Sequence, residues 1–114
     1  MERVKVIRNQ YKGWENCIEI SNGIVDLIAT TDVGPRIIRF GFIGKENEFC
    51  EVESQIGTTG GSEWNIFGGH RLWHSPEHKP RSYEPDNLKI DYWEKENGIV
   101  LSQLVEPWTQ IKKE

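Results

Sequence analysis

Two Asn-Gly pairs, Asn22-Gly23 and Asn97-Gly98, constrain the fold of this chain more than any other feature of its sequence. Each pair stands between two runs with strand character, and in that setting Asn-Gly is the strongest short-range signal for a tight antiparallel hairpin. The sequence therefore predicts antiparallel β structure in both halves of the chain. The first hairpin joins residues 15–21 to 24–30, and the second joins residues 88–96 to 99–106.

The segment between these hairpins also has strand character. Residues 36–43 place Ile38, Phe40 and Phe42 on one face of a strand, and the turn at 44–47 leads into a second run at 48–52. This pattern predicts a third hairpin with a longer loop. Residues 54–69 hold five of the eleven glycines and few periodic apolar positions, which indicates a long loop of the kind that often carries function.

Periodicity also indicates how the strands are covered. Residues 24–29 are apolar on both faces, which predicts a strand covered on both sides. In residues 88–92 the apolar side chains alternate with Lys89 and Asp91, which predicts one dry face and one wet face. No segment combines a helical period with a proper cap. We expect an all-β chain made of antiparallel sheets.

Length and charge exclude several classes of protein. A chain of 114 residues is one domain at most, and its net charge of −4, without any run of basic residues, argues against a nucleic acid partner. Its apolar runs are too short to cross a bilayer and its first ten residues contain no apolar signal region, so we expect a cytoplasmic protein without a membrane partner. Cys17 and Cys50 lie in apolar strand-like stretches, which predicts buried free thiols.

All three histidines, His70, His74 and His78, lie in the stretch GGHRLWHSPEH at residues 68–78. Their spacing of four residues would suit metal ligation on a helix, but two glycines and a proline in this stretch argue against a helix. On a strand, positions four residues apart are separated by about 13 Å, too far to share one zinc ion. We therefore expect no metal site.

The same stretch has the chemistry of a sugar site. An indole face stacks on the apolar C–H face of a pyranose, while arginine and imidazole donate hydrogen bonds to hydroxyl groups. The candidate substrate-binding residues are His70, Arg71, Trp73 and His74. In an extended chain Arg71 and Trp73 share the side opposite the histidines. In the alternative interpretation, Trp73 belongs to the core and the histidines are solvated loop residues.

Two segments together resemble a known family. TDVGPRIIRFGFIG at residues 31–44, followed by EWNIFGGHRLWHSPEHKPRSYEPDN at residues 63–87, resembles the N-terminal region of the aldose 1-epimerase (galactose mutarotase-like) family. The resemblance covers roughly residues 17–106. It implies a β-supersandwich with a sugar bound in an open cleft on one sheet. It also implies cofactor-free interconversion of sugar anomers by a general base and a general acid.

The chain departs from this family in length and in its acid/base residues. Family members are more than twice as long, and the glutamate that serves as their general base comes from a late strand that no position here matches. Glu77 lies in the wrong motif, so we assign no catalytic residue. The resemblance implies that Arg71, together with His70, orients the sugar. Arg36 is a weaker candidate for the same role, and the alternative is that it braces the sheet. The resemblance leaves phosphorylated sugars open as ligands.

The first hypothesis is therefore that residues 1–114 form a single β domain, the N-terminal part of a larger supersandwich. It would bind an aldose and be inactive alone, and its open sheet edge or face would be covered by another copy in a homo-oligomer. The alternative is a self-contained small β-sandwich that binds a carbohydrate or another small ligand without catalysis. A structural interaction domain is a third interpretation.

Overall fold

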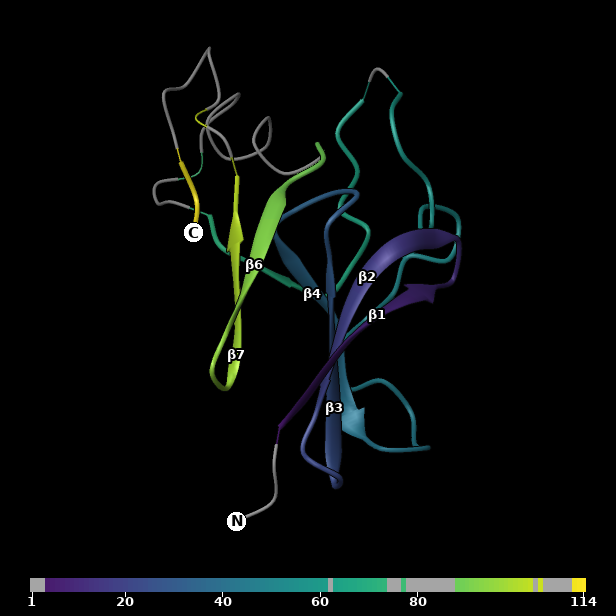
Figure 1. Cartoon of the computed structure of the whole chain (residues 1–114). Coiled ribbons are helices and arrows are strands. Elements are labelled where there is room, and N and C mark those ends of the chain that lie inside the picture. The colour runs from purple at the N-terminus through teal and green to yellow at the C-terminus, as the bar shows by residue number, and fades with distance from the viewer. Residues whose placement is uncertain (1–3, 62, 74–76, 78–87, 104, 106–111) are drawn as a thin grey trace.

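The computed structural model describes residues 4–61, 63–73, 77, 88–103, 105 and 112–114 (Figure 1). Within these residues all regular secondary structure is β, as the sequence predicts, and none of them forms a helix that could cross a membrane. The strands are β1 (Lys5–Tyr11), β2 (Trp14–Ser21), β3 (Val25–Thr30), β4 (Arg36–Phe42), β5 (His70–Arg71), β6 (Asp91–Lys95) and β7 (Gly98–Ser102).

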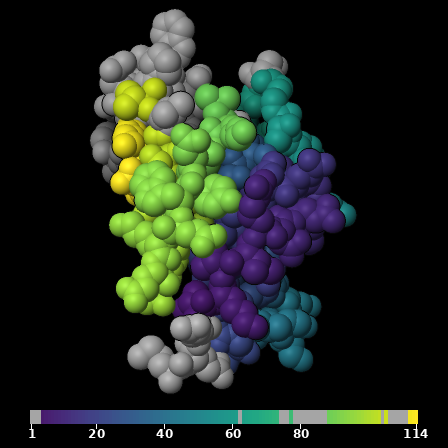
Figure 2. Space-filling view, in the orientation of Figure 1, coloured from purple at the N-terminus to yellow at the C-terminus, as the bar shows by residue number. Residues whose placement is uncertain are grey.

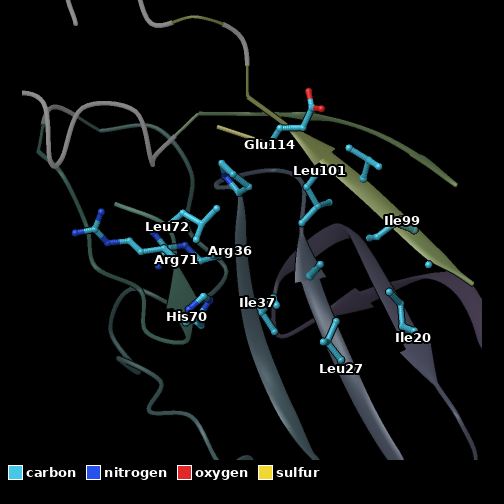
Figure 3. A pocket seen from close by; sticks show the side chains of 14 residues that line it. Ile20, Leu27, Arg36, Ile37, His70, Arg71, Leu72, Ile99, Leu101 and Glu114 are labelled. Atoms are coloured by element: carbon cyan, nitrogen blue, oxygen red, sulfur yellow. The ribbon is translucent and has the colours of Figure 1, made fainter. Parts of the chain in front are cut away.

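The strands form two antiparallel sheets. One is a five-stranded meander in the order β1-β2-β3-β4-β5, and the other is the β6–β7 hairpin, which lies over one face of the first sheet (Figures 1 and 3). The predicted hairpins at both Asn-Gly pairs are confirmed. In the second, however, Glu96 and Asn97 form the turn, and Gly98 already pairs with Lys95.

The second hairpin is also shorter than predicted. Strand β6 begins at Asp91, whereas Leu88 makes only an isolated bridge to Gly34 of the first sheet. The backbone N–H of Ile90 donates to the carbonyl oxygen of Thr31 at 2.9 Å. These two contacts attach the hairpin to the loop between β3 and β4, because residues 88–90 pair with that loop instead of extending β6.

The hydrophobic core lies on one face of the five-stranded sheet, under the long loop that precedes β5. Trp14 and Phe67 contact each other edge to face, with ring centroids 5.4 Å apart and an interplanar angle of 78°. Such aromatic pairs add about 1 kcal/mol beyond the burial of their surface. The loop is therefore anchored by its own aromatic residue. The buried members of this cluster are Trp14, Cys17, Ile28, Val33, Ile38 and Phe67.

A β-bulge in β4 overturns the prediction that Ile38, Phe40 and Phe42 share one face. The register between β3 and β4 shifts at Ile28 and Ala29, which leaves Ile38 as the extra residue. Ile38 then turns into the core, while Phe40 and Phe42 stay exposed on the opposite face. A bulge changes the alternation because it sets two residues of one strand against one of its neighbour.

The predicted third hairpin is wrong, because residues 48–52 do not form a strand. Hydrogen bonds from the side chain of Asn47 replace regular backbone pairing with β4. Its Nδ2 donates to the Ile38 carbonyl at 2.8 Å, and its Oδ1 accepts from the Phe40 and Phe49 amides. An asparagine bonded in this way competes with strand pairing. Strand β5 consequently becomes the outer neighbour of β4.

Strand β3 is covered on both faces in its second half, as predicted. Ile28 faces the core and Ala29 faces the β6–β7 side, and both are buried. The prediction of buried thiols is confirmed for Cys17 and wrong for Cys50, which is exposed. Cys50 lies in the loop after Asn47, where no regular strand turns alternate side chains inward.

Candidate functional site

The buried guanidinium of Arg36 shapes the segment that precedes β5. Its Nη1 donates to the carbonyl oxygens of Ile66 at 2.6 Å and Gly68 at 2.9 Å, and its Cζ lies 5.0 Å from the centre of the Phe67 ring. Only 2% of the residue is exposed. Arg36 thus braces the loop against the sheet.

Two glycines bring the chain from this loop into β5. Gly68 and Gly69 have φ angles of 118° and 69°, which side-chain-bearing residues rarely adopt. A Cβ at Gly68 would overlap the carbonyl oxygen of Cys50, and one at Gly69 would overlap that of Ile37. The backbone can therefore approach β4 closely enough for His70 and Arg71 to pair with it.

The structure brings Arg71 and Trp73 together on one side of the chain, as their spacing predicts. The Arg71 guanidinium carbon lies 5.0 Å from the ring centre of Trp73 and also 5.0 Å from that of Trp64. Cation–π contacts of this kind hold a guanidinium in a fixed orientation. Trp64 did not emerge from the sequence, because it lies in a glycine-rich loop without periodicity.

Trp73 is not a core residue. It is 51% exposed, although one part of its indole contacts Arg71. The alternative interpretation, which placed Trp73 in the core, is therefore wrong. An indole with this much free surface next to a guanidinium can stack on a ligand.

His70 points to the other side of β5. It pairs with Ile37, and its ring is stacked on Phe49 with centroids 6.5 Å apart. The structure therefore separates the imidazole of His70 from the stack formed by Arg71 and the two tryptophans. His74 and His78 lie outside the described residues.

A cleft of about 610 Å³ lies between the five-stranded sheet and β7 (Figure 3). Cavities of about 300–1,000 Å³ are typical of small-molecule sites. Its floor and wall are mainly apolar, and the β5 segment closes one end. The lining residues are Ile20, Leu27, Ala29, Pro35, Arg36, Ile37, His70, Arg71, Leu72, Gly98, Ile99, Val100, Leu101 and Glu114.

The polar groups of this cleft are unevenly placed. Arg36, His70 and Arg71 come from the β4–β5 side, whereas Glu114 stands beside β7 on the other side (Figure 3). Glu114 Oε2 accepts from Ser102 Oγ at 3.3 Å and pairs with Lys112 Nζ at 3.2 Å. It is the sole carboxylate among the described lining residues, and no cluster of metal-ligating side chains occurs in the described part of the chain.

A second polar group lies on the core side of the sheet, around Glu51. The carboxylate accepts hydrogen bonds from Tyr11 Oη, Lys12 Nζ and Asn47 Nδ2 at 2.8–2.9 Å. Burial acts against its charge, but these three donors outweigh it and hold the pKa of Glu51 below its usual range. Burial, followed by the bond to Glu51, raises the pKa of Tyr11. Because these groups form hydrogen bonds with one another, the cluster holds the loop at residues 44–51 in place.

No protein-family model, no curated protein and no solved structure matches this chain. The geometry offers an oriented guanidinium, an exposed indole and an apolar cavity. These groups suit recognition of a ligand that has both hydroxyl groups and an apolar face.

Proposed function

We propose that this chain binds a sugar beside β5, as the N-terminal part of an aldose 1-epimerase-like protein. The observation that carries this proposal is the stack in which Arg71 lies against Trp64 and Trp73 while Trp73 remains half exposed. The resemblance in residues 31–44 and 63–87 also supports it. The ligand would be an aldose in its ring form.

The chemistry of the stack suits a pyranose. The free part of the Trp73 indole offers an apolar surface to the C–H face of the ring, and the Arg71 guanidinium offers several N–H donors to hydroxyl groups. Because both tryptophans already orient Arg71, less side-chain entropy is lost when a ligand binds. His70, whose imidazole is separated from this stack, lines the apolar cleft and would contact only a part of the ligand that enters that cleft.

The wider architecture supports a partial β-supersandwich. The apolar residues Ile20, Leu27 and Ile37 of the first sheet face Ile99 and Leu101 of the hairpin across the cleft, so two antiparallel layers lie face to face (Figure 3). Face-to-face packing of antiparallel sheets is the principle on which sandwich folds are built. We propose that the complete fold extends both layers.

We further propose that the isolated chain does not catalyse mutarotation. Ring opening needs a general base near the anomeric hydroxyl. Glu114 is committed to Ser102 and Lys112, and it lies across the cleft from Arg71. Polarimetry of freshly dissolved α-glucose and α-galactose tests this proposal. Acceleration over buffer, lost in Arg71→Ala, would contradict it.

Binding is tested by the NMR signals of the tryptophan indole N–H groups during titration with glucose and galactose. We expect the Trp73 signal to shift, and Trp73→Ala to weaken binding about tenfold, which matches the loss of one stacking contact. Trp93→Ala is the matched control, because Trp93 is similarly exposed at 45% but lies in β6, whereas Trp73 contacts Arg71. Equal effects of the two substitutions, or no shift with either sugar, would overturn the proposal.

The apolar lining favours a second candidate function, in which a compact β-sandwich binds a small apolar ligand without catalysis. Leu27, Ile37, Ile99 and Leu101 all line the cleft. Methyl NMR distinguishes the two functions. An apolar ligand would shift the leucine and isoleucine methyl signals of the cleft, whereas a stacked sugar would shift Trp73. The interaction-domain interpretation gains support if neither class of ligand changes the spectrum.

A further inference from the structure

Strand β6 has an outer edge that is suited to a second copy of itself. We propose that two copies of the chain associate through antiparallel pairing of their β6 strands, centred on Trp93. This association is independent of the sugar site, because no residue of β6 lines the cleft. It assigns a specific edge and register to the homo-oligomer that the sequence predicts.

The register of the hairpin shows which backbone groups are available. Lys95 and Gly98 flank a two-residue turn, and hairpins of this kind close on a hydrogen-bonded pair that recurs at every second position. Asp91, Trp93 and Lys95 therefore direct their backbone N–H and C=O groups toward β7. Tyr92 and Glu94 direct theirs to the outer edge.

An observed hydrogen bond confirms this orientation. Ile90 has the same parity as Tyr92 and Glu94, and its N–H donates to Thr31 of the other sheet rather than to β7. The outward backbone N–H of Ile90 is thus bonded to Thr31. Among the described residues β6 pairs with β7 alone, and none of them forms a strand along its outer edge from Asp91 to Lys95.

The side chains of β6 are complementary to themselves in the antiparallel direction. Pairing about Trp93 sets Asp91 opposite the partner's Lys95, and Tyr92 opposite the partner's Glu94. The outward backbone groups of Tyr92 and the partner's Glu94 then meet as a hydrogen-bonded pair. Trp93 meets the partner's Trp93 at the two-fold axis, as an aromatic pair without backbone bonds.

Exposure and stability favour the same arrangement. Asp91, Trp93, Glu94 and Lys95 are all exposed, and Trp93 is 45% exposed, on a hairpin that forms part of the molecular surface (Figure 2). A two-stranded sheet is marginally stable in water, and strands added at its edge stabilise it. The pairing would continue the sheet through β7, β6, the partner's β6 and the partner's β7.

Strand β1, at one edge of the five-stranded sheet, is less suitable. Strand β1 carries Lys5 and Arg8 but no carboxylate, so self-pairing there would not give opposite-charge pairs. Positive side chains on an edge strand generally discourage pairing with other chains. The charge pattern therefore selects β6 over β1 as the self-associating edge.

The first experiment measures the dissociation constant of the full chain by sedimentation equilibrium at low salt. Because edge pairing buries little surface, we expect a weak, concentration-dependent dimer. Asp91→Lys and Lys95→Asp should each raise the dissociation constant about tenfold, since each places like charges opposite one another at both symmetric positions. The double variant, which exchanges the two charges, should restore it.

A mixture of the two single variants provides the decisive control. Asp91→Lys opposite Lys95→Asp regains both opposite-charge pairs, so the mixture should form heterodimers although neither variant self-associates well. Far-UV circular dichroism of each variant verifies folding. A chain that stays monomeric at every concentration, or single variants that associate as well as the unaltered chain, would overturn the proposal.

Cross-linking tests the register itself. In a Cys50→Ser background, Trp93→Cys places two thiols at the two-fold axis, where a pair without backbone bonds has a Cα separation of about 4.5 Å and suits a disulfide. Val100→Cys is the matched control, because Val100 pairs with Trp93 but lies one strand farther from the axis on each copy. We expect rapid oxidation of the first variant to a dimer. Equal cross-linking of both variants would contradict the register.

Discussion

The side chain of Arg36 is bonded to the backbone of Gly68: Nη1 donates to the carbonyl oxygen at 2.9 Å, and the same nitrogen donates to the carbonyl of Ile66. This bond joins β4 to the loop that leads into β5. It therefore determines where His70 and Arg71 lie, although Arg36 itself is buried. An arginine that looks like a ligand-binding group in the sequence thus supports the ligand-binding group next to it.

Arg36→Met should destabilise the protein by about 3 kcal/mol, because it leaves the carbonyls of Ile66 and Gly68 without their charged donor. The free energy of unfolding in urea measures this change. Arg8→Met is the control, since Arg8 is exposed and its guanidinium donates to the side chain of Asn16. It should cost about 0.5 kcal/mol. Similar losses for both variants would contradict the bracing role of Arg36.

Gly69→Ala should be far more destabilising than Gly60→Ala. Both glycines have φ near 70°, so an alanine is strained at either position by about 1 kcal/mol. At Gly69 the new Cβ would also overlap the backbone of Ile37 and Ile38, whereas open space surrounds Gly60. Urea unfolding separates the two effects. Equal stability of the variants would show that close approach of the chain at Gly69 is unimportant.

Glu51→Gln should lower stability at neutral pH and flatten its dependence on acid. The folded-state pKa of Glu51 is depressed, so the carboxylate contributes stability above its unfolded value of about 4.5, and this contribution is lost as the pH falls through the folded pKa. Unfolding should be followed from neutral pH downward. Glu48→Gln, at an exposed position of the same loop, should keep the acid dependence of the unaltered chain.

The two thiols should differ sharply in reactivity. Burial, with the neighbouring charge of Asp32, raises the pKa of Cys17 to about 12, and its side chain is inaccessible. Cys50 is exposed. A thiol reagent at neutral pH should therefore modify Cys50 quickly and Cys17 only after unfolding. Loss of the fast phase in Cys50→Ser confirms the assignment, and fast modification of Cys17 would contradict the core.

The sequence predicted where the strands lie better than it predicted which strands pair with one another. Alternating apolar residues and the Asn-Gly pairs located both hairpins, because those signals act within a few residues. The predicted third hairpin failed at Asn47, whose side chain bonds Ile38 and Phe40 and ends regular pairing. Whether a side chain forms hydrogen bonds with solvent or with the backbone depends on the surrounding fold, so no local sequence pattern predicts it.

The candidate site shows the same division. Spacing predicted that Arg71 and Trp73 share one side of the chain, and the structure confirms it. Spacing did not predict the contact of Arg71 with Trp64. It also did not predict the apolar cleft that is lined by Leu27 and Ile99. These partners come from distant segments, and their proximity depends on how the loop and the hairpin fold back.

The sequence by itself determined the β class, the positions of the two hairpins and the pairing of Arg71 with Trp73, because each follows from strand periodicity or turn chemistry over a short range. Only the tertiary structure decided that Ile38 turns into the core, that Arg36 braces the loop and that no described residue forms a strand along the outer edge of β6. A bulge, a buried hydrogen bond and an unpaired edge each depend on strands that are remote in the sequence.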